Sequence, residues 1–246
     1  MKTGRIAVAL AVLTALSLPL WAQAKKITFG SDATFPPMEF VDSAKNVVGF
    51  DVDMINAAAK AAGFTAVVKN TAWDGIFAGL TAGDYDAVLS SVTITDERKG
   101  TMDFSTPYVN AGQVIIVPKT NKKVTKPDQL SGLKVGVQIG TTGDIAVAKI
   151  AKVDKKTYDE IGLAVEDLSI GRLDAVVVDS PIAANYVLQN DKYKAKLMIV
   201  GAPFTEEFYG VAVKKGNSAV LDLVNKGLAA IQKNGTMDAL KKKWLQ

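Results

Sequence analysis

The chain has 246 residues, of which 48% are hydrophobic and 22% are charged, with a formal net charge of +4. It contains neither cysteine nor histidine, which excludes disulfides, cysteine nucleophiles and zinc–thiolate sites and removes the commonest general base and metal ligand. We therefore expect a globular domain held together by its core, with no cofactor and no metal, and the small net charge gives no indication of nucleic-acid binding.

The first 24 residues have the three parts of a secretory signal peptide. Lys2 and Arg5 form a basic n-region, residues 6–20 form an apolar h-region, and Ala22-Gln23-Ala24 provides a cleavage site. The apolar run is too short for a spanning helix. We expect cleavage before Lys25 and export, which leaves 222 residues for one large domain or two small ones.

Strands and helices then alternate along the chain. The first half predicts strands at 27–30, 66–68 and 87–89, and helices at 50–62 and 73–82. The second half repeats this order, with strands at 134–138 and 175–178 and a helix from 142 to 149. Two further helices are predicted at 219–231 and 236–244. This βαβαβ order indicates mostly parallel sheets flanked by helices.

A weak internal echo suggests two related halves. Residues 80–88 and 168–176 share Leu, Gly, Asp, Ala and Val at one constant offset, and each reads as a helix end, a glycine cap and a turn into a buried strand. A duplication explains the echo, and so does the general recurrence of helix-to-strand turns in α/β proteins.

The segment from Ser90 to Arg98 follows the first of these strands and can be interpreted in two ways. An arginine presents a planar fork of donors that matches a carboxylate, and Ser90, Ser91 and Thr93 supply hydroxyls around it. The same segment can cap the next helix through Thr95 or Asp96.

Asp179 follows the strand of the second half at the equivalent place. Ligands of open α/β sheets bind beyond the carboxyl ends of strands, so Arg98 and Asp179 are expected to face each other, as an α-amino acid zwitterion requires. The alternative for Asp179 is a helix N-cap before Ser180-Pro181.

Four motifs together resemble the polar amino acid-binding proteins that serve ABC importers, and the resemblance covers essentially the whole mature chain. The motifs are Gly30–Phe40, Val48–Asp53, Ser90–Ser105 and Gly140–Gly143. The resemblance implies an α/β, two-lobed periplasmic binding protein fold of type II, in which each lobe is a mostly parallel sheet flanked by helices and ligand is trapped by closure. The expected limits are 1–24 for the signal peptide, 25–107 plus 210–246 for lobe I, 113–204 for lobe II, and 108–112 and 205–209 for the hinge segments. Glu206 and Glu207 in the second segment suit an exposed crossing.

The resemblance also implies the roles of individual residues. Arg98 would bind the ligand α-carboxylate with Thr93 and Thr142, while Asp179 would accept from the α-ammonium with help from Ser91. Phe35 and Trp73 would form aromatic walls, although either could be an ordinary core residue. Asp32, Ser90 and Gln138 would contact the far end of the ligand, and Asp32 has the alternative of a turn residue before Pro36-Pro37. No residue is expected to be catalytic.

Asp32 between aromatic faces favours a basic ligand such as arginine or lysine. Glutamine is the rival, because Gln138 is neutral and an aspartate also accepts from an amide. A dehydratase of cyclohexadienyl acids on the same fold is the alternative of another class, but Asp179 would repel a substrate without an amino group. The expected partners are a free L-amino acid and the membrane permease of an ABC importer, in the periplasm, with the protein as a monomer.

Overall fold

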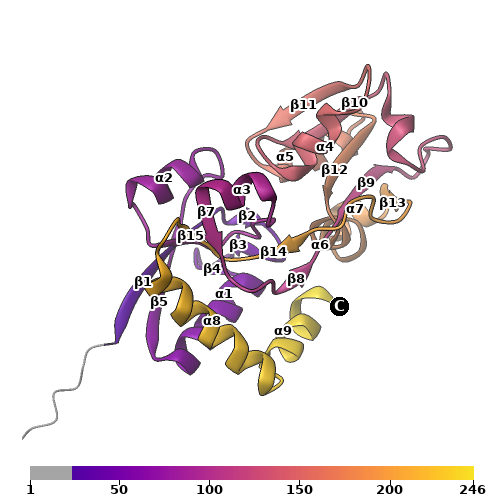
Figure 1. Ribbon diagram of the computed structural model, residues 1–246. Coiled ribbons are helices and arrows are strands. Elements are labelled where there is room, and N and C mark those ends of the chain that lie inside the picture. The colour runs from indigo at the N-terminus through magenta and orange to yellow at the C-terminus, as the bar shows by residue number, and fades with distance from the viewer. Residues whose placement is uncertain (1–23) are drawn as a thin grey trace, which may run out of the picture.

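The computed structural model describes residues 24–246. Two α/β lobes lie side by side, joined by extended crossing segments (Figure 1). The predicted signal peptide falls almost wholly outside the described residues. None of the helices in the described part combines the length and the apolar character needed to cross a membrane.

One five-stranded sheet forms the centre of the first lobe, with strands in the order β5-β1-β6-β15-β7. Strand β1 pairs in parallel with β5 and β6, whereas β15 pairs antiparallel with both β6 and β7. All strands except β15 therefore run in one direction. The bounds are β1 Lys25–Ser31, β5 Phe64–Asn70, β6 Ala87–Val88, β7 Met102–Phe104 and β15 Ala212–Lys214.

The second five-stranded sheet repeats this pattern in the order β11-β10-β12-β9-β13. Strand β10 pairs in parallel with β11 and β12, and β9 is the one reversed strand, antiparallel to β12 and β13. The bounds are β9 Gln113–Pro118, β10 Lys134–Gln138, β11 Asp154–Tyr158, β12 Ala175–Asp179 and β13 Leu197–Val200. The expected two-lobed architecture of mostly parallel sheets is confirmed.

The remaining strands of the described residues form two smaller sheets. In the first, β14 pairs antiparallel with β8, and these strands lie in the two segments that cross between the lobes (Figure 1). In the second, β2, β3 and β4 form a ribbon next to the first sheet. The bounds are β2 Thr34–Phe35, β3 Glu39–Val41, β4 Val47–Val48, β8 Val109–Asn110 and β14 Phe208–Tyr209.

The helices flank these sheets. The bounds are α1 Phe50–Ala62, α2 Ile76–Ala82, α3 Asp96–Thr101, α4 Thr142–Ala148, α5 Ile161–Ser169, α6 Ser180–Ala184, α7 Asp191–Lys194, α8 Ser218–Lys233 and α9 Thr236–Leu245, with single turns at Pro127–Leu130 and Asn185–Gln189. Helix α2 begins three residues later than predicted, because Gly75 adopts a left-handed conformation with φ of 83° that cannot continue a helix.

Helix α1 shows how sequence dictates packing in the first lobe. Its buried face contains Val52, Ile55 and Ala59, as the helical period predicts, and it ends at Gly63 in a left-handed cap. The helix packs against α8, and Gly227 of α8 lies directly against the main chain of Ala58.

The sequence echo corresponds to one structural device used twice. The Asp86 carboxylate accepts the main-chain N–H of Thr28 at 2.8 Å before β6, and Asp174 accepts that of Lys134 at 2.8 Å before β12. Each aspartate therefore fixes the entry of a buried strand beside the strand with which it pairs in parallel, β1 for β6 and β10 for β12.

Candidate functional site

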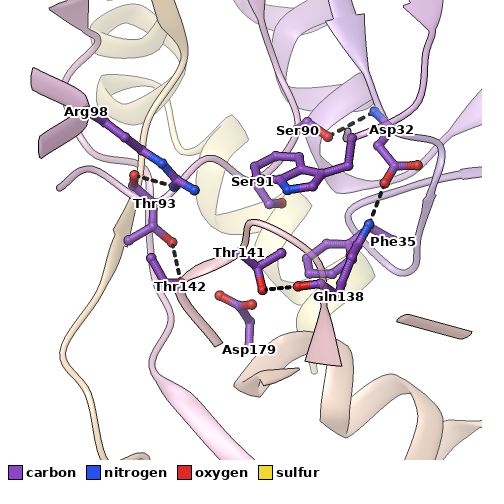
Figure 2. Close-up of a pocket in the computed structure, with 11 residues that line it drawn as sticks. Asp32, Phe35, Ser90, Ser91, Thr93, Arg98, Gln138, Thr141, Thr142 and Asp179 are labelled. Carbon is purple, nitrogen blue, oxygen red and sulfur yellow. Dashed lines mark hydrogen bonds between the residues drawn. The ribbon is translucent and has the colours of Figure 1, made fainter. Parts of the chain in front are cut away.

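A cavity lies between the two lobes. All ten residues singled out from the sequence line it, together with Thr141, which the sequence reasoning missed (Figure 2). They are Asp32, Phe35, Trp73, Ser90, Ser91, Thr93, Arg98, Gln138, Thr142 and Asp179.

The carboxyl ends of four strands deliver the polar residues of the cavity. Asp32 follows β1, and Ser90 and its neighbours follow β6. Gln138 ends β10 and Asp179 ends β12 in the other lobe. Because parallel strands end at one edge of a sheet, the two sheet edges bring these side chains to opposite walls of the cavity.

The segment around Arg98 serves as both helix cap and cavity wall. Thr95 is the N-cap of α3, and its hydroxyl accepts the main-chain N–H of Arg98 at 3.1 Å. The Arg98 guanidinium is separate from this cap. Its Nη1 donates to the main-chain oxygen of Thr93 at 2.9 Å, and its Nη2 approaches the oxygen of Gly140 across the lobes at 3.4 Å. Both interpretations of this segment are thus compatible.

Two aromatic rings lie against the Arg98 guanidinium. Its Cζ is 5.6 Å from the centroid of Trp73 and 5.1 Å from that of Phe77, a residue the sequence reasoning missed. These distances are typical of cation–π contacts. Burial lowers the pKa of Arg98, while the nearby carboxylates of Asp179 and Glu207 raise it, so the guanidinium stays charged.

Asp179 faces the cavity from the opposite lobe. It stands at the N-cap position of α6, but its side chain makes no capping hydrogen bond there. Burial raises the pKa of Asp179 to about 6, with a further contribution from the negative charge of Glu207. A cation placed beside this carboxylate would restore its ionised form.

Asp32 forms the far end of the cavity and bridges the two lobes. One of its carboxylate oxygens accepts from the Thr34 hydroxyl at 2.7 Å, and the other accepts from Nε2 of Gln138 at 2.8 Å (Figure 2). The Gln138 amide also donates to the main-chain oxygen of Asp159 at 2.9 Å. Burial raises the pKa of Asp32, and the charge of Glu160 adds to the shift.

A buried pair of carboxyl groups, Glu39 and Asp51, lies behind the serines of the cavity and was missed from the sequence. Ser90 donates to Glu39 at 3.0 Å, and Asp51 accepts the main-chain N–H of Ser91 at 3.0 Å and the Tyr108 hydroxyl at 2.8 Å. Burial raises the pKa of both acids, and the charge of Asp51 raises that of Glu39 further. Both shifts favour the protonated form, so the pair holds a proton more tightly than two solvent-exposed carboxyl groups would.

Asp51 also explains an unusual backbone conformation. Ser91 has a φ of 47°, in the left-handed region that side chains other than glycine rarely adopt. The hydrogen bond from its N–H to the buried Asp51 carboxylate holds it there. The cavity wall thus depends on a helix residue that does not line it.

Glu207 corrects one expectation. The segment 205–209 was expected to be an exposed crossing; Glu206 and Phe208 are exposed, but Glu207 is only 8% exposed. Its Oε2 accepts from the Thr142 hydroxyl at 2.6 Å and from the Thr93 hydroxyl at 2.9 Å. The expectation failed for Glu207 because burial alternates along 206–209, which places Glu207, just before β14, on the same side of the chain as the buried Tyr209.

The described residues of the site can bind a molecule that carries both a positive and a negative charge, but they do not form a cluster of metal ligands. Within residues 24–246, no cluster of three or more acidic side chains is placed to hold a metal ion. The cavity instead offers one guanidinium and carboxylates on facing walls, which is suited to a small molecule that carries both signs of charge.

Comparison with known proteins agrees with this geometry. The family described as bacterial extracellular solute-binding proteins, family 3, matches residues 27–246. A probable histidine-binding protein of Neisseria gonorrhoeae is 43% identical over 218 residues, which cover 87% of this chain and 81% of the relative. The L-cystine-binding protein TcyJ of Escherichia coli K12 is 39% identical over 217 residues, which cover 87% of this chain and 80% of the relative.

The solved structures include an ancestral arginine-binding protein bound to arginine. It is 42% identical, superimposes with a TM-score of 0.86, and the match covers 91% of this chain and all of that structure. The chain is therefore a member of the bacterial extracellular solute-binding proteins of family 3.

Proposed function

We propose that this protein binds a free L-amino acid with a basic side chain, of the arginine or lysine type, between two closing lobes and delivers it to the permease of an ABC importer. One observation carries the proposal. Arg98 from the first lobe and Asp179 from the second line the same cavity, whose far end contains Asp32. The three charges match the α-carboxylate, the α-ammonium and a cationic side chain in that order.

The surroundings of Asp32 favour the basic ligand. A surface hollow beside the cavity is lined in part by the acidic residues Asp32, Asp159 and Glu160. A hollow with this negative charge attracts cations from solution and raises their rate of association. Trp73 and Phe35 provide aromatic faces for the stem and head of the side chain.

Glutamine is the weaker alternative. Its side-chain amide could donate to Asp32, but Gln138 already donates to that carboxylate at 2.8 Å. A neutral amide would also leave the charge of Asp32 uncompensated, and burying an unpaired carboxylate is costly. Arginine supplies a charge and several donors at once.

A dehydratase of cyclohexadienyl acids is not favoured. The matched relatives are amino acid-binding proteins, and the Asp179 carboxylate would repel a substrate without an amino group. Solute-binding proteins of this kind are not enzymes.

We further propose that lobe I comprises residues 25–107 and 210–246, that lobe II comprises residues 113–204, and that 108–112 and 205–209 act as hinges. The two sheets support these limits, since their strands fall within the corresponding ranges. Export through a cleaved N-terminal signal to the periplasm, and action as a monomer, complete the proposal.

A calorimetric panel of the twenty L-amino acids tests the function. Arginine or lysine should bind with one site per chain and with higher affinity than glutamine, and glutamate should not bind. No heat with any basic amino acid, combined with binding of another class, would refute the assignment.

A further inference from the structure

Glu207 occupies a position that links the two lobes. It lies in the segment 205–209, and its carboxylate accepts hydroxyl groups from both sides of the cavity. Thr93 belongs to the first lobe and donates at 2.9 Å, while Thr142 belongs to the second and donates at 2.6 Å. The two hydroxyl oxygens are 3.4 Å apart (Figure 2). One carboxylate oxygen thus joins the two walls at the Arg98 end.

The same residue is anchored to both crossing segments, through its side chain to 205–209 and through its main chain to 108–112. Its other oxygen accepts from the Thr205 hydroxyl at 2.7 Å, and that hydroxyl in turn accepts the main-chain N–H of Gln113 at 2.8 Å. The main-chain oxygen of Glu207 accepts the N–H of Ala111 at 2.8 Å. These contacts fix the position of the Glu207 carboxylate relative to the two crossing segments. A change in the backbone conformation of these segments would therefore move the carboxylate.

The hydrogen-bonding capacity of the threonines gives this contact a consequence for the ligand. A hydroxyl has one hydrogen and two lone pairs, and a carboxylate can only accept. When Thr93 and Thr142 donate to Glu207, neither hydroxyl keeps a hydrogen for a ligand in the cavity. The Thr142 oxygen also accepts from Nε2 of Gln113 at 3.2 Å. A ligand carboxylate at this end therefore relies on Arg98 for its donors.

We propose that Glu207 is a positioning residue that ties the lobes together through Thr93 and Thr142, stabilising the closed form and setting the orientation of both hydroxyls. Charge-assisted bonds of this kind are stronger than neutral ones, and they form only when both lobes are in place. The consequence for affinity rests on the proposed function, whereas the closing of the lobes does not.

The first test uses the ligand-free protein and needs no amino acid. The variants are Glu207→Gln and, as a matched control, Glu206→Gln, which removes the neighbouring exposed carboxylate. Small-angle scattering should give a larger radius of gyration for Glu207→Gln than for the wild type and for the control. Equal radii for all three proteins would overturn the proposal, whatever the natural ligand is.

The second test asks whether Glu207 acts through Thr142. L-Arginine affinity is measured for Glu207→Gln, Thr142→Val and the double variant, with Thr142→Ser as the variant that restores the hydroxyl. We expect each single loss to weaken binding roughly ten- to hundredfold, and the double variant to be no weaker than the worse single variant. Additive losses would overturn the coupling. Absence of any amino acid binding by the wild type would refute the proposed function and leave the scattering result to decide the tie between the lobes.

Discussion

Replacing Arg98 by methionine separates its two roles. Methionine keeps much of the apolar stem but removes the guanidinium, which contacts Thr93 and lies over Trp73 and Phe77. The cap of α3 uses the main-chain N–H of Arg98 and the Thr95 hydroxyl, so it survives the substitution. We therefore expect Arg98→Met to fold and to lose ligand binding.

The size of the loss follows from the burial of the guanidinium in the closed cavity. Truncating one partner of a buried, hydrogen-bonded charge pair costs about 2–5 kcal/mol, which corresponds to a roughly 30- to 5,000-fold rise in Kd. Calorimetry with L-arginine measures it, and circular dichroism checks the fold. Arg98→Lys keeps the charge without the bidentate fork, and its affinity for L-arginine should lie between those of the wild type and Arg98→Met. Near-wild-type affinity in Arg98→Met would show that this residue acts only in the helix.

Three further substitutions and one titration address other parts of the structure. Asp32→Asn should lower the affinity for arginine by at least about tenfold and the affinity for glutamine much less, because the lost interaction with arginine is charge-assisted. Equal losses of affinity in calorimetry would remove the preference for a basic ligand. Ammonium binding requires ionised Asp179, whose pKa in the ligand-free protein is about 6, so arginine affinity should be full above about pH 7 and should fall, by about tenfold at pH 5, as the carboxylate is protonated. Asp179→Asn should bind weakly and flatten this part of the profile, and an unchanged profile would contradict the role of Asp179. In Gly227→Ala the new Cβ would lie 2.5 Å from the main-chain oxygen of Ala58, so thermal denaturation should show a loss of about 1–3 kcal/mol with an unchanged Kd; full stability would refute the close packing of α1 on α8.

Several features of the fold could be predicted because one local signal dominated. Helix α1 was predicted over the range it occupies, since its apolar residues follow the helical period and Gly63 ends it. The site residues at the ends of β1, β6, β10 and β12 were predicted because parallel strands end at a common edge, and the resemblance to a family of binding proteins selected among them.

The buried carboxylates that were missed act through other residues, whereas Thr141 lines the cavity itself. Asp51 shares the buried face of α1 with Met54, Ile55 and Ala58, so the helical period indicates that it points inward. Its pairing with Glu39 brings together residues of a strand and a helix, which no local pattern reveals. Glu207 carried a similar signal in its spacing from Tyr209, but the adjacent Glu206 made the segment look solvated. Propensity describes single elements, and these carboxylates are buried by contacts between elements.

The crystal structure of the protein with L-arginine tests the central claim most directly. We predict one molecule in the cavity, with its α-carboxylate on Arg98, its α-ammonium on Asp179 and its guanidinium at Asp32. A ligand bound in the reverse direction, or outside this cavity, would contradict the account.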